Sequence, residues 1–169
     1  MGGMTATRLK RSGYPFNTPL ETGIRMLALL SAAAPSECDL QRLSYFDYLV
    51  VHSADVAGGP ESAHPATPHR SGEFLVRRGL LERALLLMFS RGLIVRLFSD
   101  RGIQYAASKL TIPFLEHLEA PYTKLLRERA TWVIGRFGTM NDAALRDHFR
   151  EHLGEWGAEF IRDYGQTEE

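Results

Sequence analysis

The sequence contains very little cysteine, and this limits the chemistry available to the protein. Cys38 is the single cysteine among 169 residues. One thiol can neither form a disulfide within the chain nor build a Cys-rich zinc site. Scarce cysteine is also typical of proteins from a reducing compartment, so we expect a cytoplasmic protein.

Long hydrophobic runs and net charge are missing as well. No apolar run approaches the roughly 20 residues that a membrane-spanning helix needs. Arg8, Lys10 and Arg11 near the N-terminus are not followed by the apolar segment of a secretory signal, so we expect no membrane. The 20 Lys and Arg residues balance the 20 Asp and Glu residues. This balance argues against a polybasic nucleic-acid binder, although a local basic patch stays compatible with it.

Signatures of common enzyme classes are absent too. The run Ala57-Gly58-Gly59-Pro60 lacks the lysine and the helix start of a phosphate-binding loop. No Gly-x-Ser-x-Gly motif occurs, and no sequence pattern marks a catalytic base for Cys38. We therefore expect no cofactor and no catalytic residue.

Helical periodicity is present over most of the chain. Hydrophobic residues make up 44% of it, enough for a packed core. The stretch Thr18-Pro19-Leu20-Glu21 has the pattern of a capping box, and the helix that it starts should end near Pro35. Either Ser36 or Asp39 should cap a second helix. Further helices are expected from Glu73 to Arg91, from Pro113, from Pro121 to near Gly138, and from Thr139 or Asn141 onward.

The third predicted helix and the segment after it favour a winged-helix fold. The helix is apolar around most of its circumference, so we expect it to be the buried central element. Residues 93–98 and 103–106 are rich in strand-forming residues and flank a turn at Ser99-Asp100-Arg101-Gly102. Three helices followed by a hairpin are the order of a winged helix-turn-helix. We therefore predict a mainly α fold with a minor β part: a winged-helix-like core with a hairpin wing in residues 15–106, a helical extension in residues 107–165, and flexible ends at 1–14 and 166–169.

Three histidines gather around a proline-rich loop between the second and third helices. His52, with Asp55 one turn later, precedes the loop, and His64 and His69 lie within it. Their spacing matches no zinc signature, so the metal interpretation is the weaker one. We expect that His52, Asp55, His64, His69 and Arg70 anchor an ordered loop, whose prolines lower the entropy lost on ordering.

The stretch His148-Phe149-Arg150-Glu151-His152 spells H-x-x-E-H, the inverted form of a zinc-protease motif. Phe149 lies at the centre of the apolar stripe of the last helix, and both histidines fall on one flank of that stripe. Glu151 points away from it. A solvated helix edge explains this pattern, and a five-residue match is weak evidence for a zinc enzyme. No metal ligand is therefore assigned.

Arginines cluster around the third helix and the hairpin. In a DNA-binding winged helix such arginines would contact phosphates or base edges. Glu73 and Glu82 partly cancel this positive charge, so salt bridges to a protein partner fit the pattern at least as well. The candidate partner-binding or DNA-binding residues are Glu73, Arg77, Arg78, Arg83, Arg96 and Arg101.

Five segments together resemble one known family. In order within residues 14–137, they are PFNTPLETGIRML, DLQRLSYFDYLVVHSADV, PESAHPATPHRSGEFLVRR, GIQYAAS and PFLEHLEAPYTKLLRERATWV. They resemble the middle component of three-component ABC-ATPase (ABC-3C) systems, the group that includes Lamassu-type antiphage defence. This resemblance implies a non-catalytic accessory subunit that bridges an SMC-like ABC ATPase and an effector, often a nuclease. It also implies that DNA is contacted through the complex.

Two other functions remain open from the residues alone. A stand-alone winged-helix DNA-binding transcriptional regulator would present a basic recognition face and bind its operator in a salt-dependent way. A small metallohydrolase built on the histidines would copurify with a metal. The bridging subunit should do neither by itself and should bind its ATPase.

Overall fold

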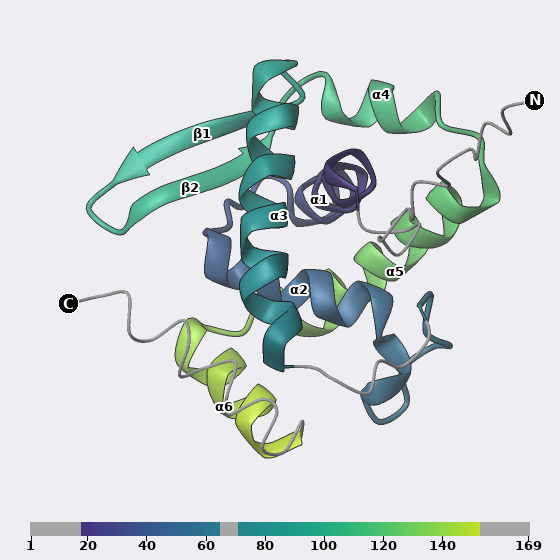
Figure 1. Ribbon diagram of the computed structural model, residues 1–169, viewed down its shortest axis with the longest axis vertical. Helices are drawn as coiled ribbons and strands as arrows, with labels where there is room; N and C mark the ends of the chain where they lie inside the picture. The colour runs from purple at the N-terminus through teal and green to yellow at the C-terminus, as the bar shows by residue number, and fades with distance from the viewer. Residues whose placement is uncertain (1–17, 65–70, 153–169) are drawn as a thin grey trace, which may run out of the picture.

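A computed structural model of the protein describes residues 18–64 and 71–152, with side chains except at 71–76 and 152. Its elements are α1 (Pro19–Ala33), α2 (Leu40–Val51), the 3₁₀ turn η1 (Ser53–Asp55), α3 (Ser71–Ser90), β1 (Ile94–Ser99), β2 (Gly102–Ala107), α4 (Thr111–Glu116), α5 (Pro121–Phe137) and α6 (Asp142–His152) (Figure 1). They confirm a mainly α fold with a β-hairpin. None of the helices described is long and apolar enough to cross a membrane.

Local capping residues set the starts of three helices. Thr18 caps α1, because its side-chain oxygen accepts a hydrogen bond from the Glu21 N–H at 3.2 Å. Asp39 is the cap of α2, where it accepts from the Arg42 N–H at 2.7 Å. Asn141 caps the first turn of α6 in the same way. In each case a side chain satisfies a backbone donor that the helix itself leaves unpaired.

The central element is α1, so the prediction that α3 would hold this place is wrong. Four apolar residues of α1 have no exposed surface: Met26, Leu27, Leu29 and Leu30. By contrast, α3 leaves Leu86 59% exposed and Phe89 37% exposed. The helix α1 packs against α3 and α5 and also contacts α2, α4 and β2 (Figure 1). An apolar circumference predicted burial for α3, but one side of α3 packs on α1 while Phe89 on another side supports the hairpin through Arg96.

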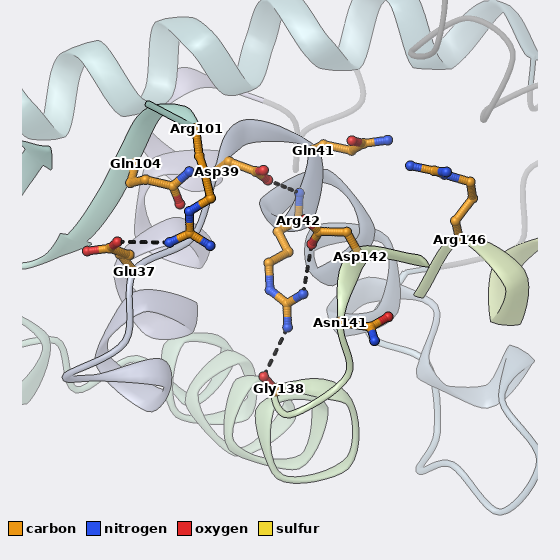
Figure 2. Close-up of a pocket in the computed structure, with 10 residues that line it drawn as sticks. All are labelled: Glu37, Asp39, Gln41, Arg42, Arg101, Gln104, Gly138, Asn141, Asp142 and Arg146. Carbon is orange, nitrogen blue, oxygen red and sulfur yellow. Dashed lines mark hydrogen bonds and ion pairs between the residues drawn. The ribbon is translucent and has the colours of Figure 1, made fainter. Parts of the chain in front are cut away.

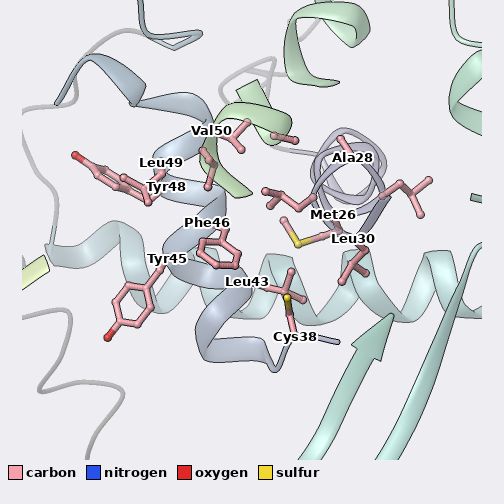
Figure 3. Close-up of a cluster of buried hydrophobic side chains, with 14 of the residues drawn as sticks. Met26, Ala28, Leu30, Cys38, Leu43, Tyr45, Phe46, Tyr48, Leu49 and Val50 are labelled. Atoms are coloured by element: carbon pink, nitrogen blue, oxygen red, sulfur yellow. The ribbon is translucent and has the colours of Figure 1, made fainter. Parts of the chain in front are cut away.

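One cluster contains buried apolar side chains from each of the helices α1 to α6, and its α1 and α2 part is shown in Figure 3. The later helices contribute Leu126, Ala130, Val133, Phe137, Leu145 and Phe149 to it. The Phe149 ring lies 4.4 Å from the Tyr45 ring, measured between centroids, and so fastens α6 to α2. Side chains from both predicted stretches, 15–106 and 107–165, therefore share this core. The boundary between those stretches stays a prediction.

The hairpin extends away from the end of α3 (Figure 1). Its strands are antiparallel, and Arg96 lies opposite Tyr105. Gly102 closes the turn with a φ of +91°, a left-handed conformation that glycine adopts without strain. Tyr105 also exchanges two backbone hydrogen bonds with Cys38, at 2.9 and 2.8 Å. This bridge attaches β2 to the connection between α1 and α2.

Candidate functional site

A group of charged and polar side chains lies inside the helical core, beside the first part of the proline-rich loop. Arg25 of α1 and Asp47 of α2 are both completely buried, and the Arg25 Nε lies 2.6 Å from the Asp47 Oδ1. Arg77 of α3 approaches the second Asp47 oxygen at 3.8 Å. The His64 Nε2 in the loop lies 2.6 Å from the Tyr122 hydroxyl of α5. We call these five residues the buried charge cluster.

The cluster fixes the charge state of its own members. Burial by itself would raise the pKa of Asp47, but Arg25 and Arg77 outweigh burial and hold that pKa below its ordinary value. Burial, followed by the positive charge of Arg25, lowers the pKa of His64 to about 4, although Asp47 opposes this shift. Burial also raises the pKa of the Tyr122 phenol. Near pH 7 the cluster therefore contains an ionised carboxylate and two guanidinium groups beside a neutral imidazole and a neutral phenol.

The cluster and its surroundings hold the described part of the loop, up to His64, against the helices. The His64 backbone N–H donates to the Val51 carbonyl at the end of α2 at 3.0 Å. The Glu61 carbonyl accepts from the Ser53 hydroxyl and from the Arg129 Nε of α5, each at 3.1 Å. This part of the loop is thus joined to α2 on one side and to α5 on the other.

The structure places the predicted loop anchors in different environments. His52 is buried at the end of α2, with its ring 4.9 Å from the Tyr48 ring. Asp55 accepts a hydrogen bond from the Tyr48 hydroxyl. His64 belongs to the buried charge cluster, whereas His69 and Arg70 lie outside the described residues.

The predicted partner-binding or DNA-binding residues also differ in their surroundings. Three arginines lie near carboxylates of the same chain: Arg77 near Asp47, Arg78 at 3.3 Å from Glu82, and Arg101 at 3.5 Å from Glu37. Arg83 is exposed on α3. Arg96 lies over the Phe89 ring at 4.1 Å from its centroid. The side chain of Glu73 lies outside the described part of the chain.

A pocket of about 540 Å³ lies where the hairpin, α2 and α6 meet (Figure 2). It is lined by Glu37, Asp39, Gln41, Arg42, Arg101, Gln104, Gly138, Asn141, Asp142 and Arg146. Arg42 crosses it, donating to the Gly138 carbonyl at 2.9 Å and pairing with Asp142 at 3.0 Å. Three arginines face three carboxylates in this pocket, so it offers no net charge to a ligand. Its contacts instead hold α6 against the start of α2.

Within the residues that the structure describes, no group of three or more His, Cys, Asp or Glu side chains is arranged to hold a metal ion. In the H-x-x-E-H stretch, Phe149 is buried, and the His148 ring packs edge-on against Phe137 at 5.0 Å. Glu151 is exposed. The described side chains of this stretch therefore have the environments expected at the edge between the buried and the solvated side of a helix.

The sequence analysis did not select Arg25, Asp47 or Tyr122. A signal for Arg25 was present, because it interrupts the apolar run of the first predicted helix while Asp47 interrupts the aromatic stretch of the second. Opposite charges on two predicted core faces indicate a buried ion pair, since an unpaired buried charge is strongly unfavourable. Tyr122 carries no comparable signal, because a tyrosine near a helix start is common at surfaces.

Comparison with known protein families gives one match over most of the chain. The family is MC2, described as ABC-three component (ABC-3C) system Middle Component 2, and it matches residues 15–159. The chain belongs to this family. No curated protein and no solved structure matches it. The family match confirms the resemblance to an ABC-3C middle component and includes the buried charge cluster and the hairpin. By its family name, this middle component acts with the other components of an ABC-3C system.

Proposed function

We propose that this middle component is a non-catalytic subunit that bridges an SMC-like ABC ATPase and an effector, such as a nuclease, in a Lamassu-type antiphage complex of the cytoplasm. The family match over residues 15–159 carries the proposal. A middle component has two neighbours in a three-part system, and a bridge is the simplest role for a small chain between them.

The environment of the polar groups supports a role without catalysis. Cys38 is 3% exposed, and burial raises the pKa of its thiol to about 11, so it is not the thiolate that a nucleophile requires. Arg25 and Asp47 have no exposed side-chain surface and so offer no access to a substrate. Their contacts join α1, α2 and α3, as expected of a rigid adaptor.

Two features support a winged-helix interpretation of the first half. The elements α1, α2 and α3 precede the hairpin, in the order of a winged helix-turn-helix. The bridge between Cys38 and Tyr105 holds the hairpin to the connection between α1 and α2, an attachment that is consistent with a wing. Winged-helix units serve DNA binding or protein binding, and the charges of this chain are the basis for our choice of partner.

The charges favour a protein partner. Arg77, which a DNA-reading helix would expose, lies against buried Asp47, and its side chain is 12% exposed. Arg78 and Arg101 are opposed by Glu82 and Glu37. The whole chain has no net charge. Few phosphate contacts remain available, so the isolated chain should have weak, sequence-independent affinity for DNA.

The test is reconstitution of the three components. We expect the chain to co-elute with the ABC ATPase of its system in size-exclusion chromatography, and fluorescence anisotropy of the isolated chain with duplex DNA to show weak binding. An ATPase that elutes separately at micromolar concentration contradicts the bridging function. Nanomolar binding of the isolated chain to one operator in physiological salt would instead establish the regulator.

A further inference from the structure

The hydrogen-bond pattern of the hairpin shows which backbone N–H and C=O groups of β1 point away from β2. The Tyr105 N–H and C=O both bond to Cys38, so they point away from β1. Residues directly opposite each other in an antiparallel pair are either doubly hydrogen-bonded or not bonded at all. Arg96, which lies opposite Tyr105, must therefore direct its own N–H and C=O away from β2. Ile94 and Phe98, two residues to either side, do the same because the strand repeats every two residues.

These outward groups form an unpaired strand edge. Among the described residues, no hydrogen bond joins the backbone of β1 to any element other than β2. The side chains around this edge are apolar and exposed. Val95 is 38%, Leu97 41% and Phe98 75% exposed, and Ile103 opposite Phe98 is 43% exposed. Natural edge strands usually carry charged residues, proline or a covering element that prevents pairing. The strand β1 contains no lysine or proline, and Arg96 is its one charged residue.

Arg96 adds an unmatched charge to this surface. Its guanidinium lies 4.1 Å from the centroid of the Phe89 ring and 5.9 Å from that of Phe98. Its Nε is buried and has no hydrogen-bond partner in the described part of the chain. No carboxylate among the described residues forms an ion pair with it, whereas Arg78 and Arg101 each have one. The aromatic rings thus hold a positive charge beside the open edge, and no counter-ion for it occurs in residues 18–64 or 77–151.

We propose that β1 is a docking edge for an extended strand of another ABC-3C component, a strand with apolar side chains and a carboxylate that reaches Arg96. The inference rests on the proposed bridging function and assigns it a surface. The incoming strand would hydrogen-bond to the outward groups of Arg96 and Phe98, as in other recognition by strand addition. Ile94, at the start of β1, is 2% exposed and lies outside this docking edge. It would cover Val95, Leu97 and Phe98 with apolar side chains and supply the missing negative charge.

The same charge disfavours a second copy of this chain as the occupant. Two β1 edges paired antiparallel around their middle would place the two Arg96 side chains opposite each other. A shift of two residues would still leave them diagonal neighbours, within about 8 Å. Like charges at these positions are destabilising, so a partner with an acidic residue fits this edge better.

The first test compares two charge reversals, one within β1 and one just after β2, in the reconstituted complex. Arg96→Glu should weaken the affinity for the partner components roughly tenfold or more, because it opposes the incoming carboxylate. Lys109→Glu is the matched control: it makes the same charge change at an exposed position beyond the end of β2 and should alter affinity little. Circular dichroism verifies that both variants fold as the wild type does.

A second pair of variants separates the contribution of the backbone N–H of Phe98 from that of its side chain. Phe98→Ser removes the aromatic ring, whereas Phe98→Pro removes the ring and the outward N–H without deleting a bond to β2. The proline variant should bind more weakly than the serine variant. If Arg96→Glu fails to fold, this pair of variants tests by itself whether β1 is the docking edge.

Hydrogen exchange resolved to single residues gives a direct readout. The N–H groups of Arg96 and Phe98 should exchange rapidly in the isolated chain and slowly in the complex, while those of Val95 and Leu97, which face β2, should be protected in both. An intact complex with Arg96→Glu, or unchanged exchange at Arg96 and Phe98, overturns the docking edge and leaves the bridging function standing. A dimer of the isolated chain that Phe98→Pro dissociates identifies a second copy as the occupant and also overturns it. If the wild-type chain binds no component, the bridging function itself fails.

Discussion

Arg25 and Asp47 bring opposite charges together at two positions with no exposed side-chain surface, one on α1 and one on α2. Such a pair adds little net stability, because removing two charges from water offsets most of their attraction. Once both are buried, however, the loss of either partner leaves an uncompensated charge in the core. Arg77 and Thr22 add further contacts, at 3.8 Å to Asp47 and 3.3 Å to Arg25, and restrict the pair to one geometry.

We predict that Asp47→Ala lowers the free energy of unfolding by about 3–5 kcal/mol, because it leaves Arg25 buried without its carboxylate. The matched control is Asp142→Ala, which removes a 64% exposed carboxylate from the Arg42 pair and should cost about 0–1 kcal/mol. Urea unfolding followed by circular dichroism measures both. The double variant Arg25→Met/Asp47→Leu should lose less stability than Asp47→Ala, and equal losses for the two single variants would contradict this account.

His64 should make stability depend on pH. Its pKa falls from 6.5 to about 4 on folding, so the unfolded chain takes up a proton first as the pH decreases. The free energy of unfolding should therefore decline from about pH 6.5 towards pH 4. The stability that neutral His64 contributes is fully present above this range and lost below it. Burial is the largest cause of this lowered pKa, Arg25, Arg77 and His52 lower it further, and Asp47 opposes the shift.

The measurement for His64 is the urea midpoint as a function of pH. We expect His64→Gln to flatten the decline between pH 6.5 and about 4, because glutamine cannot take up the proton. His117→Gln, at the exposed position directly after α4, is the control and should keep the wild-type slope. An identical slope in all three proteins would assign the pH dependence to other groups.

At the scale of elements, the described part of the loop after η1 depends on a close backbone approach at Gly59. A Cβ at this position would lie 2.0 Å from the Ser53 carbonyl oxygen and 2.9 Å from that of Val56. These are backbone atoms, so relief requires the whole turn to shift. Gly135 in α5 provides the contrast, because a Cβ there would meet nothing within 4 Å.

We predict opposite effects for the same substitution at these two glycines. Gly59→Ala should destabilise the protein by roughly 1–3 kcal/mol, the usual range for forced overlap. Gly135→Ala should stabilise it by about 0.5–1 kcal/mol, since alanine restricts the unfolded chain and favours the helix. Thermal or urea unfolding of both variants gives the comparison. Destabilisation by Gly135→Ala, or none by Gly59→Ala, would contradict these contacts.

At the scale of the whole molecule, one apolar cluster spans α1 to α6. The side chains of Val133 and Phe137 have no exposed surface, although they come from the predicted extension at 107–165. A domain that shares its core with a following segment cannot lose that segment without exposing apolar surface. The predicted division into residues 15–106 and 107–165 therefore runs through a core to which both parts contribute side chains.

We predict that the full chain unfolds in one cooperative transition. In a Trp156→Phe background, the fluorescence of Trp132 on α5 should follow the same urea curve as the far-ultraviolet circular dichroism. A fragment of residues 15–106 should fail to fold by itself, since it lacks the side chains that α5 supplies. Two separated transitions, or a folded fragment, would support an independent unit at 15–106.

Signals that act over a few residues of sequence were sufficient for the individual elements. Thr18 and Asp39 have their helix-capping hydrogen bonds three residues along the chain, so their roles were predictable before any packing was known. The turn at Ser99 to Gly102 likewise has its glycine where a left-handed residue is needed. The quoted segments also indicated the family, which the match over residues 15–159 confirmed.

The tertiary structure alone decided which side chains meet across the fold. Arg25 and Asp47 are separated by 22 positions in the chain, and His64 and Tyr122 by 58. Periodicity identifies the apolar face of a helix but not the element that this face contacts, so α3 rather than α1 was predicted to be central. The same limit applies to Arg77 and Arg96: the sequence shows two arginines, and only packing turns one towards buried Asp47 and leaves the other beside an open strand edge without a described counter-ion.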